Sequence, residues 1–177
     1  IVNWNNRTDT LACIEQLKKS QYANQDILLV DNASTDGSAD AIAAEMPQIT
    51  MIRNHKNLGF TGGNNIGMKV AFERGADYAF LLNNDAEIEA DVLQLLVEVM
   101  ETNPEVWATA PMIYYYSQPK VIWSAGGAID SRLGTAKMLG TDEVDQAQFG
   151  SSPYPVDYAT GCALMVRRSI VEKFGLL

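Results

Sequence analysis

The chain has 177 residues, 47% of them hydrophobic and 20% charged, which suits one globular domain with its own core and argues against disorder. Its formal net charge of -9 disfavours partners such as a nucleic acid backbone or anionic lipid, because both require clustered cations. No apolar run approaches the roughly 18 residues that a membrane-spanning helix needs.

The cysteine content gives no metal site. Cys13 and Cys162 are far apart in the sequence, and the chain has a single histidine, His55. Both cysteines have apolar neighbours, so we expect two buried free thiols and a reducing, cytoplasmic compartment. Any association with the inner face of a membrane would come from a lipid ligand or from residues outside this sequence.

The first half of the chain alternates strands with helices. We expect strands at 1–4, 26–30, 49–53 and 78–82. We expect helices that begin at Thr8 or Asp9, run from Ser38 to before Pro47, and span 64–74 and 90–101, with a loop at 54–63. Strand 78–82 is nearly all apolar, as in a parallel sheet covered on both faces. The alternation predicts an α/β domain with a mainly parallel sheet.

The second half has a different pattern. Strands are expected at 106–116, 121–123 and 136–139, followed by a long polar loop at 141–155. Residues 156–166 are apolar again, and Ser169 is expected to cap a short helix through Phe174. No linker divides the chain. We therefore expect one domain, 1–177, lacking residues at both ends, with a ligand-binding half at 1–105 and a mixed-strand half at 106–177.

Polar residues follow all four strands of the first half. In open α/β sheets, ligands bind at the carboxyl ends of the strands. Any one of these residues has an ordinary role in a turn or helix cap, but four such strand ends favour a ligand site. Asp31 could accept a hydrogen bond from a ribose or base. Trp4 offers a face for base stacking, or else is a core aromatic residue at a strand end.

The segment Asn57-Leu58-Gly59-Phe60-Thr61-Gly62-Gly63-Asn64-Asn65 leads into a predicted helix. Free backbone N–H groups and the positive end of a helix dipole can hold a diphosphate at such a place. The signal is weak alone, because it matches neither the dinucleotide fingerprint nor the loop of nucleoside triphosphatases.

Asp85 follows the most apolar strand and is a candidate ligand for a hard divalent cation. Asn83 lies two residues earlier, so its side chain can face the same side of an extended chain. Glu87 and Glu89 are better explained as charges near the start of the next helix.

Several motifs together resemble the family 2 glycosyltransferases. The segment from Val30 to Ser38 is similar to the family's signature after the second strand. Asn57 to Gly67 and Leu81 to Asp85 are similar to its rhamnosyltransferase-like branch. Trp123 to Gly127 and Gly161 to Arg168 extend the resemblance over nearly the whole chain.

The resemblance implies the GT-A fold. It also implies transfer of a sugar from a nucleoside diphosphate sugar with inversion of configuration. The rhamnosyltransferase-like branch suggests dTDP-rhamnose as the donor. The acceptor would be a glycan or lipid-linked glycan of a surface polysaccharide. Mg²⁺ or Mn²⁺ would bind at Asp85, with Asn83 in place of the family's first aspartate. The residues implied for nucleotide binding are Val2, Asn3, Trp4, Asp31, Asn32, Gly59, Gly62, Gly63, Asn64 and Asn84. Those implied for the acceptor side are Trp123, Gly126, Gly161 and Cys162.

The family's catalytic base has no match in the chain, and the resemblance places it beyond Leu177. Inverting transfer needs a carboxylate that takes the proton of the acceptor hydroxyl. The principal alternative is therefore a non-catalytic module that binds a nucleotide sugar or glycan. A sugar-1-phosphate nucleotidyltransferase or a nicotinamide oxidoreductase is less favoured, because neither glycine-rich signature is present.

Overall fold

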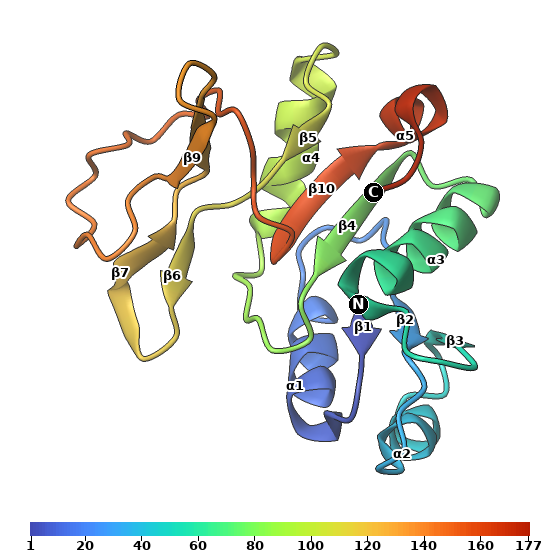
Figure 1. Ribbon diagram of the computed structural model, residues 1–177. Helices are drawn as coiled ribbons and strands as arrows, with labels where there is room; N and C mark the ends of the chain where they lie inside the picture. Colours follow the sequence, from blue (N-terminus) through green and yellow to red (C-terminus); the bar gives the residue numbers. More distant parts are fainter.

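The computed structural model describes residues 1–177 as an α/β fold from which two hairpins project (Figure 1). The strands are β1 (Val2–Asn3), β2 (Leu28–Asp31), β3 (Thr50–Arg53), β4 (Tyr78–Leu82), β5 (Ala108–Thr109), β6 (Ile113–Tyr115), β7 (Gln118–Ser124), β8 (Gly127–Asp130), β9 (Thr135–Met138) and β10 (Ala163–Arg167). The helices are α1 (Arg7–Leu17), α2 (Ser38–Glu45), α3 (Gly59–Glu73), α4 (Val92–Thr102) and α5 (Arg168–Phe174). None of these helices has the length and apolar character needed to cross a bilayer.

The central sheet is built from two three-stranded parts. β1, β2 and β3 pair in parallel, whereas β10 lies antiparallel between β4 and β5. One parallel bridge, between Val2 and Asn83, joins the two parts. The predicted α/β class is confirmed. The expectation that strand 78–82 lies in a parallel environment is wrong for its main partner, because β10 returns along it in the opposite direction.

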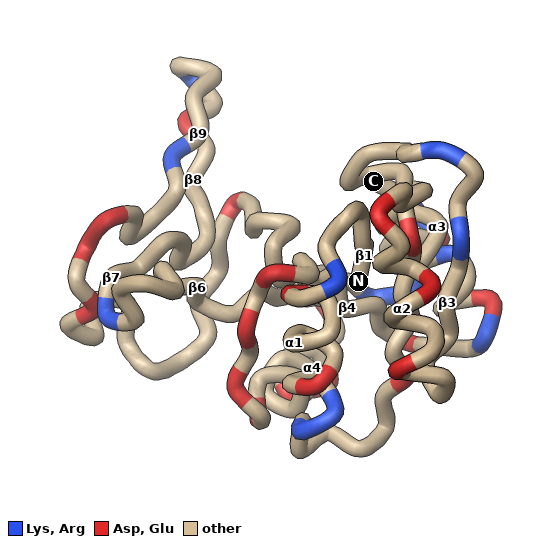
Figure 2. Tube along the Cα trace, turned by 90° about the horizontal axis from the view of Figure 1, so that it is seen from below, with Lys and Arg blue, Asp and Glu red and all other residues tan.

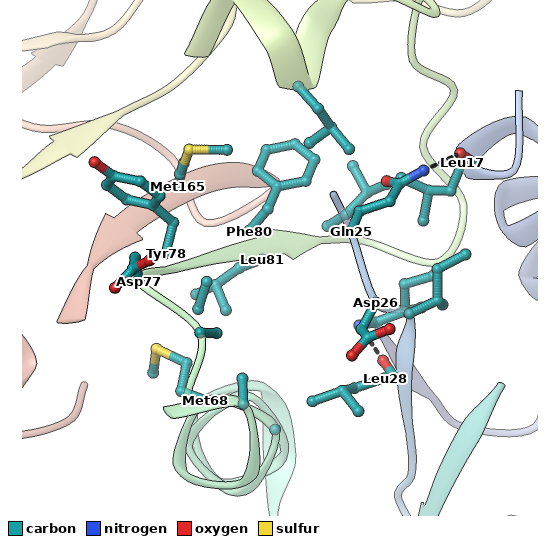
Figure 3. A pocket seen from close by; sticks show the side chains of 18 of the residues that line it. Leu17, Gln25, Asp26, Leu28, Met68, Asp77, Tyr78, Phe80, Leu81 and Met165 are labelled. Carbon is teal, nitrogen blue, oxygen red and sulfur yellow. Dashed lines mark hydrogen bonds between the residues drawn. The ribbon is translucent and has the colours of Figure 1, made fainter. Parts of the chain in front are cut away.

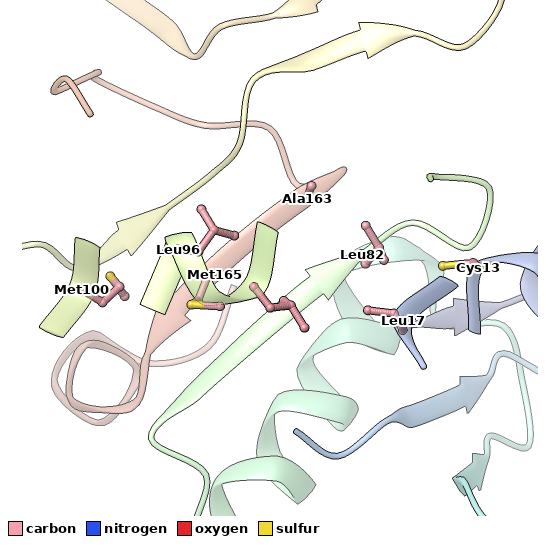
Figure 4. Close-up of a cluster of buried hydrophobic side chains, with 8 residues drawn as sticks. Cys13, Leu17, Leu82, Leu96, Met100, Ala163 and Met165 are labelled. Carbon is pink, nitrogen blue, oxygen red and sulfur yellow. The ribbon is translucent and has the colours of Figure 1, made fainter. Parts of the chain in front are cut away.

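Helices cover both faces of this sheet. On one face, Met68 of α3 packs against Ala79, Leu81 and Val166. On the other, a larger cluster joins α1, α4, β4 and β10 (Figure 4). Its members are Cys13, Leu17, Leu82, Leu93, Leu96, Met100, Ala163 and Met165. Alternate residues of β4 thus enter opposite cores, which explains why the strand is apolar throughout.

Several predicted boundaries differ from the structure. α1 begins at Arg7, because the Asn6 side chain accepts from the Asp9 N–H at 3.3 Å and provides the cap expected from Thr8 or Asp9. α5 begins at Arg168 without a side-chain cap, so the expectation for Ser169 is wrong.

The second half also contains more strands than predicted. Residues 106–116 form β5 and β6, which belong to different sheets, and β8 was not predicted. The β6–β7 and β8–β9 hairpins stand apart from the central sheet in both views (Figures 1 and 2). Figure 2 also shows acidic positions along most of the chain, with basic positions scattered between them.

Candidate functional site

A pocket of about 280 Å³ lies at the carboxyl ends of β1 and β4, beside the N-terminus of α3. The sequence-predicted residues that line it are Val2, Trp4, Asn32, Gly59, Asn64, Asn83, Asn84 and Asp85. Asn57, Phe60 and Leu82 complete the lining. The structure therefore brings together residues from four separate segments of the first half, at the edge of the sheet where ligands of α/β folds bind.

Trp4 is the aromatic group of this pocket. Its side chain is 56% exposed, which excludes the alternative of a core aromatic residue. Asn5 follows it with a positive φ of 52°, so the chain turns sharply directly after β1. An exposed indole at the mouth of a pocket can stack on a planar ring such as a nucleobase.

A buried polar network lies next to the pocket and is centred on Asn3. The Asn3 amide nitrogen is 3.0 Å from Asp31 Oδ1 and 3.1 Å from the hydroxyls of both Ser34 and Ser38. The second oxygen of Asp31 accepts from the Ser34 N–H at 3.1 Å. Asp31 is only 3% exposed and does not line the pocket. In this structure its carboxylate holds the first two strand ends together, and the hydrogen bond to a ribose or base that the sequence suggests for it stays a prediction.

Thr10 connects this network to the other side of the pocket. Its hydroxyl lies 2.9 Å from Asn3 Oδ1 and accepts from the Asn84 side chain at 2.8 Å. It also lies 2.5 Å from the Asn6 carbonyl, and since a hydroxyl has one proton it donates to one of these acceptors at a time. The position of Asn84 thus depends on a residue of α1 that the motifs did not indicate.

Asn32 organises the segment before α3. Its amide donates to Asn57 Oδ1 at 2.9 Å and to the Gly59 carbonyl at 3.1 Å. Its carbonyl accepts from Asn54 at 3.1 Å and from the Leu58 N–H at 3.0 Å. The Asn32 side chain thus forms four hydrogen bonds with backbone and side-chain groups, and these bonds hold the segment that leads into α3.

α3 begins at Gly59, five residues earlier than predicted. The glycines that we assigned to a loop form its first turns, with Gly59 at a φ of 69°. A Cβ on Gly63 would lie 2.9 Å from Val2, and one on Gly62 would lie 2.6 Å from Leu58. Gly62 and Gly63 therefore serve close packing and do not line the pocket. The first N–H groups of the helix, which have no intrahelical acceptor, remain at its pocket end.

The charge of the pocket is confined to one group. Asp85 is the only ionisable residue in its lining, and no Lys or Arg is among the eleven lining residues. Asp85 is exposed, and Asn83 lies in the same lining. The described residues contain no group of three or more His, Cys, Asp or Glu that could hold a metal ion by themselves.

Both cysteines lie near Asp85 as free thiols. Burial raises the pKa of Cys13 to about 11, and the nearby Asp85 carboxylate contributes in the same direction. Burial and Asp85 also raise the pKa of Cys162, which is half-buried, although we had expected a fully buried thiol. Protonated thiols are poor metal ligands, so oxygen atoms are the ligands this site offers.

The four residues expected on the acceptor side do not gather in one place. A Cβ on Gly161 would lie 2.7 Å from the ring of Phe60, and the Cys162 carbonyl accepts from the Asn83 N–H at 2.9 Å. Gly161 and Cys162 thus border the pocket. Trp123 lies in β7 and Gly126 directly precedes β8, and neither lines the pocket.

Solved structures with the same fold are glycosyltransferases of the GT-A class. A mannosyltransferase, PcManGT from Pyrobaculum calidifontis, in complex with GDP-Man and Mn²⁺, aligns with 99% of this chain and 45% of its own, with a TM-score of 0.65 and 16% identity. GalNAc-T7 with UDP, GalNAc and Mn²⁺ aligns with 99% of this chain and 36% of its own, with a TM-score of 0.71 and 16% identity. At such identities the likeness shows the fold.

The sequence relationship is more specific. The model of glycosyl transferase family 2 matches residues 1–175, so the chain belongs to that family. Glycosyltransferase GlyG of Streptococcus pneumoniae serotype 4 is 28% identical over 98 residues, which cover 53% of this chain and 32% of that protein. The chain thus spans less than half the length of each of these relatives.

Proposed function

We propose that the chain binds a nucleoside diphosphate sugar in this pocket and forms the donor half of an inverting glycosyltransferase. The observation that carries the proposal is the composition of one pocket. It combines the exposed Trp4, the N-terminus of the 15-residue helix α3, and Asp85 with Asn83. These groups match, in turn, a base, a diphosphate and a divalent cation bound to that diphosphate.

The charge balance of the pocket supports a divalent cation. A diphosphate brings several negative charges, while the lining supplies one further carboxylate and no basic side chain. The partial positive charge of a helix N-terminus does not offset this excess. Asp85 and Asn83 offer oxygen ligands that fit Mg²⁺ or Mn²⁺, with phosphate oxygens and water completing the shell. When bound, such a cation stabilises the negative charge that develops on a leaving diphosphate.

The identity of the sugar and of its acceptor is proposed from the motifs. The rhamnosyltransferase-like segments favour dTDP-rhamnose as donor and a glycan or lipid-linked glycan of a surface polysaccharide as acceptor, handled on the cytoplasmic side. Gly161 and Cys162 border the pocket through Phe60 and Asn83, so the acceptor is proposed to approach from that side.

The base is proposed to follow Leu177. Leu177 is fixed beside the pocket, because its N–H donates to Asn65 Oδ1 at 3.0 Å and its carbonyl accepts from Asn65 Nδ2 at 2.9 Å. Asn65 is adjacent to Asn64, which lines the pocket. These contacts support the proposal of a base within one or two helical turns after Leu177.

A non-catalytic binding module is the second candidate function. It is favoured by the single carboxylate of the pocket, since Asp85 cannot serve both as metal ligand and as base. Sequencing the gene beyond Leu177 separates the two. An acidic residue in a short helix there supports the transferase, and a stop codon at that point supports the binding module.

The donor proposal is tested by calorimetric titration of the chain with UDP, dTDP and GDP, with and without Mn²⁺. We expect at least one nucleoside diphosphate to bind, at least tenfold more tightly with the metal. Asp85→Ala should abolish this difference, whereas Glu87→Ala, an exposed carboxylate two residues away, should preserve it. The absence of binding for all three nucleotides would overturn the proposal. Metal dependence that survives in Asp85→Ala would exclude Asp85 as the ligand.

A further inference from the structure

Phe60 is an aromatic residue that the core of the molecule does not use. The largest cavity, of about 720 Å³, lies between β2 and β4 on the side of the sheet where these strands begin, and its lining is mostly hydrophobic (Figure 3). Leu81 and Met165, which line it, belong to the clusters of buried apolar side chains that form the core. Phe60 lines the pocket beside α3 instead, belongs to none of these clusters and is 46% exposed.

Two contacts hold Phe60 in this position. Its carbonyl oxygen accepts a hydrogen bond from the Asn64 side chain at 3.0 Å, within the first turns of α3. Its ring lies directly against Gly161, where a Cβ atom would come within 2.7 Å of Cζ and 2.9 Å of Cε1. Gly161 thus leaves the room that the ring occupies, although the two residues are far apart in the sequence.

The order of the strands places Phe60 at one end of the pocket. In the sheet, β1 is joined to the end of β4 by one bridge, and β10 lies on the other side of β4. Trp4 follows β1, Asp85 follows β4 and Gly161 precedes β10, so these residues lie in that order along the edge of the sheet. A ligand with its base on Trp4 and its diphosphate near Asp85 therefore brings its third part, the sugar, toward Phe60.

The polar groups at the start of α3 already have partners within the protein. Asn57 Oδ1 accepts from the Asn32 side chain at 2.9 Å and from the Gly59 N–H at 2.7 Å, and the Asn64 amide donates to Phe60. A sugar at this end meets an apolar ring, which it can contact through its C–H groups. A negatively charged sugar would find no Lys or Arg in the lining, and it would lie in the same pocket as Asp85.

We propose that Phe60, packed on Gly161, is the apolar wall of the sugar subsite and restricts the donor to neutral sugars. The proposal rests on the donor function proposed above and identifies the residue that contacts the sugar. The ring contributes to the affinity for a nucleotide sugar and not to the affinity for the free nucleoside diphosphate. Gly161 is a positioning residue, because it determines where the ring lies.

Calorimetric titration with three matched pairs in the presence of Mn²⁺ tests the wall. The pairs are UDP with UDP-glucose, dTDP with dTDP-glucose, and GDP with GDP-mannose. For the pair that binds most tightly, Phe60→Ala should weaken the nucleotide sugar by about fivefold or more and the free nucleotide by less than about twofold. Phe60→Leu, which stays apolar, should fall between the wild type and Phe60→Ala. Trp4→Ala should weaken both members of the pair by the same factor.

Gly161→Ala tests the contact without changing the ring. The added methyl group would displace Phe60, so this variant should reproduce the selective loss of affinity for the nucleotide sugar. In the Phe60→Ala background, the same substitution should change that affinity by less than about twofold, because the displaced ring is absent. An unchanged affinity for the free nucleotide shows that each variant is folded.

The restriction to neutral sugars is tested with UDP-glucuronate, dTDP-glucuronate and GDP-mannuronate, each of which differs from its neutral counterpart only at C6. The neutral member should bind about tenfold more tightly or better. A uronate that binds as tightly as the neutral sugar, or an equal loss for both members of a matched pair in Phe60→Ala, would overturn the wall alone. Absence of binding for all three nucleoside diphosphates would overturn the donor function, and the wall with it.

Discussion

Asn3 and Thr10 set the geometry of the pocket beside α3 without contributing to its surface. Asn3 joins the ends of β1 and β2 through Asp31, and Thr10 joins Asn3 to Asn84. All these contacts are buried or partly buried, so an unpaired group would have no solvent to replace a lost partner. A residue that only positions others can therefore influence ligand binding as strongly as a contact residue.

Replacing Thr10 by valine tests this role, because the side chain keeps its shape and loses its hydroxyl. Asn84 and Asn3 would each lose a partner, which should lower the free energy of unfolding by about 1–3 kcal/mol. Nucleoside diphosphate affinity should fall as well. Urea unfolding and titration measure the two effects. Thr8→Val, an exposed position in the same helix, should change stability by less than about 0.5 kcal/mol. Equal effects at both positions would contradict the network.

The buried thiol of Cys13 predicts a loss of stability at alkaline pH. Its pKa is about 11 in the folded chain, against an ordinary value of 9.0, so between these values the unfolded chain releases a proton that the folded chain keeps. Stability should therefore be complete below pH 9 and decline as the pH rises toward 11, by an amount on the order of 2 kcal/mol.

Urea unfolding at pH 8 and pH 10 measures this slope. Cys13→Ala should reduce the decline, and Cys162→Ala should reduce it by less, since the Cys162 side chain is less buried. An undiminished decline in Cys13→Ala would show that other groups, such as the tyrosines, are responsible.

At the scale of the elements, helix α3 depends on glycine for its approach to the sheet. A methyl group at Gly63 would lie 2.9 Å from Val2, so Gly63→Ala should destabilise the chain by about 1–3 kcal/mol despite the higher helix propensity of alanine. Val2→Ala removes the obstructing methyl groups. The double variant should be more stable than the sum of the single effects by at least about 0.5 kcal/mol, as measured by urea unfolding. Strict additivity would contradict the contact.

The same helix shows why sequence reasoning succeeded in some places and failed in others. Local patterns located α2 and β4 well. Gly37 and Pro47 mark the two ends of α2, and a run of apolar residues marks β4. The start of α3 was misplaced, because glycine disfavours helices in general. The glycines are tolerated in α3 because a side chain at Gly62 or Gly63 would collide with Leu58 or Val2. The local sequence pattern does not reveal these contacts.

The direction of β4 relative to its neighbouring strand was also not predictable from the sequence. The direction of β4 relative to its partner depends on β10, about 80 residues later, and no local pattern reports that pairing. Eight of the residues named from strand ends and motifs line one pocket in the structure. Thr10 was not among them, because it lies on helix α1, away from any strand end or motif, and only its contacts with Asn3 and Asn84 reveal its role.

At the scale of the whole molecule, the chain is an acidic α/β domain in which the pocket beside α3 and the cavity between β2 and β4 lie at opposite ends of the same central strands. β1 links the two regions. Its carboxyl end carries Asn3 and leads into Trp4, and its amino end opens into the cavity between β2 and β4.

The central claim, that the pocket beside α3 binds a nucleoside diphosphate, is tested most directly by mapping amide chemical shifts during titration with UDP or dTDP and Mg²⁺. We predict that the largest changes fall on the Trp4 indole, on Phe60 and its neighbours in the first turn of α3, and on Asn83 to Asp85. The hairpins β6–β7 and β8–β9 should be unaffected. Binding whose largest changes fall on the hairpins or on the cavity between β2 and β4 would contradict the claim.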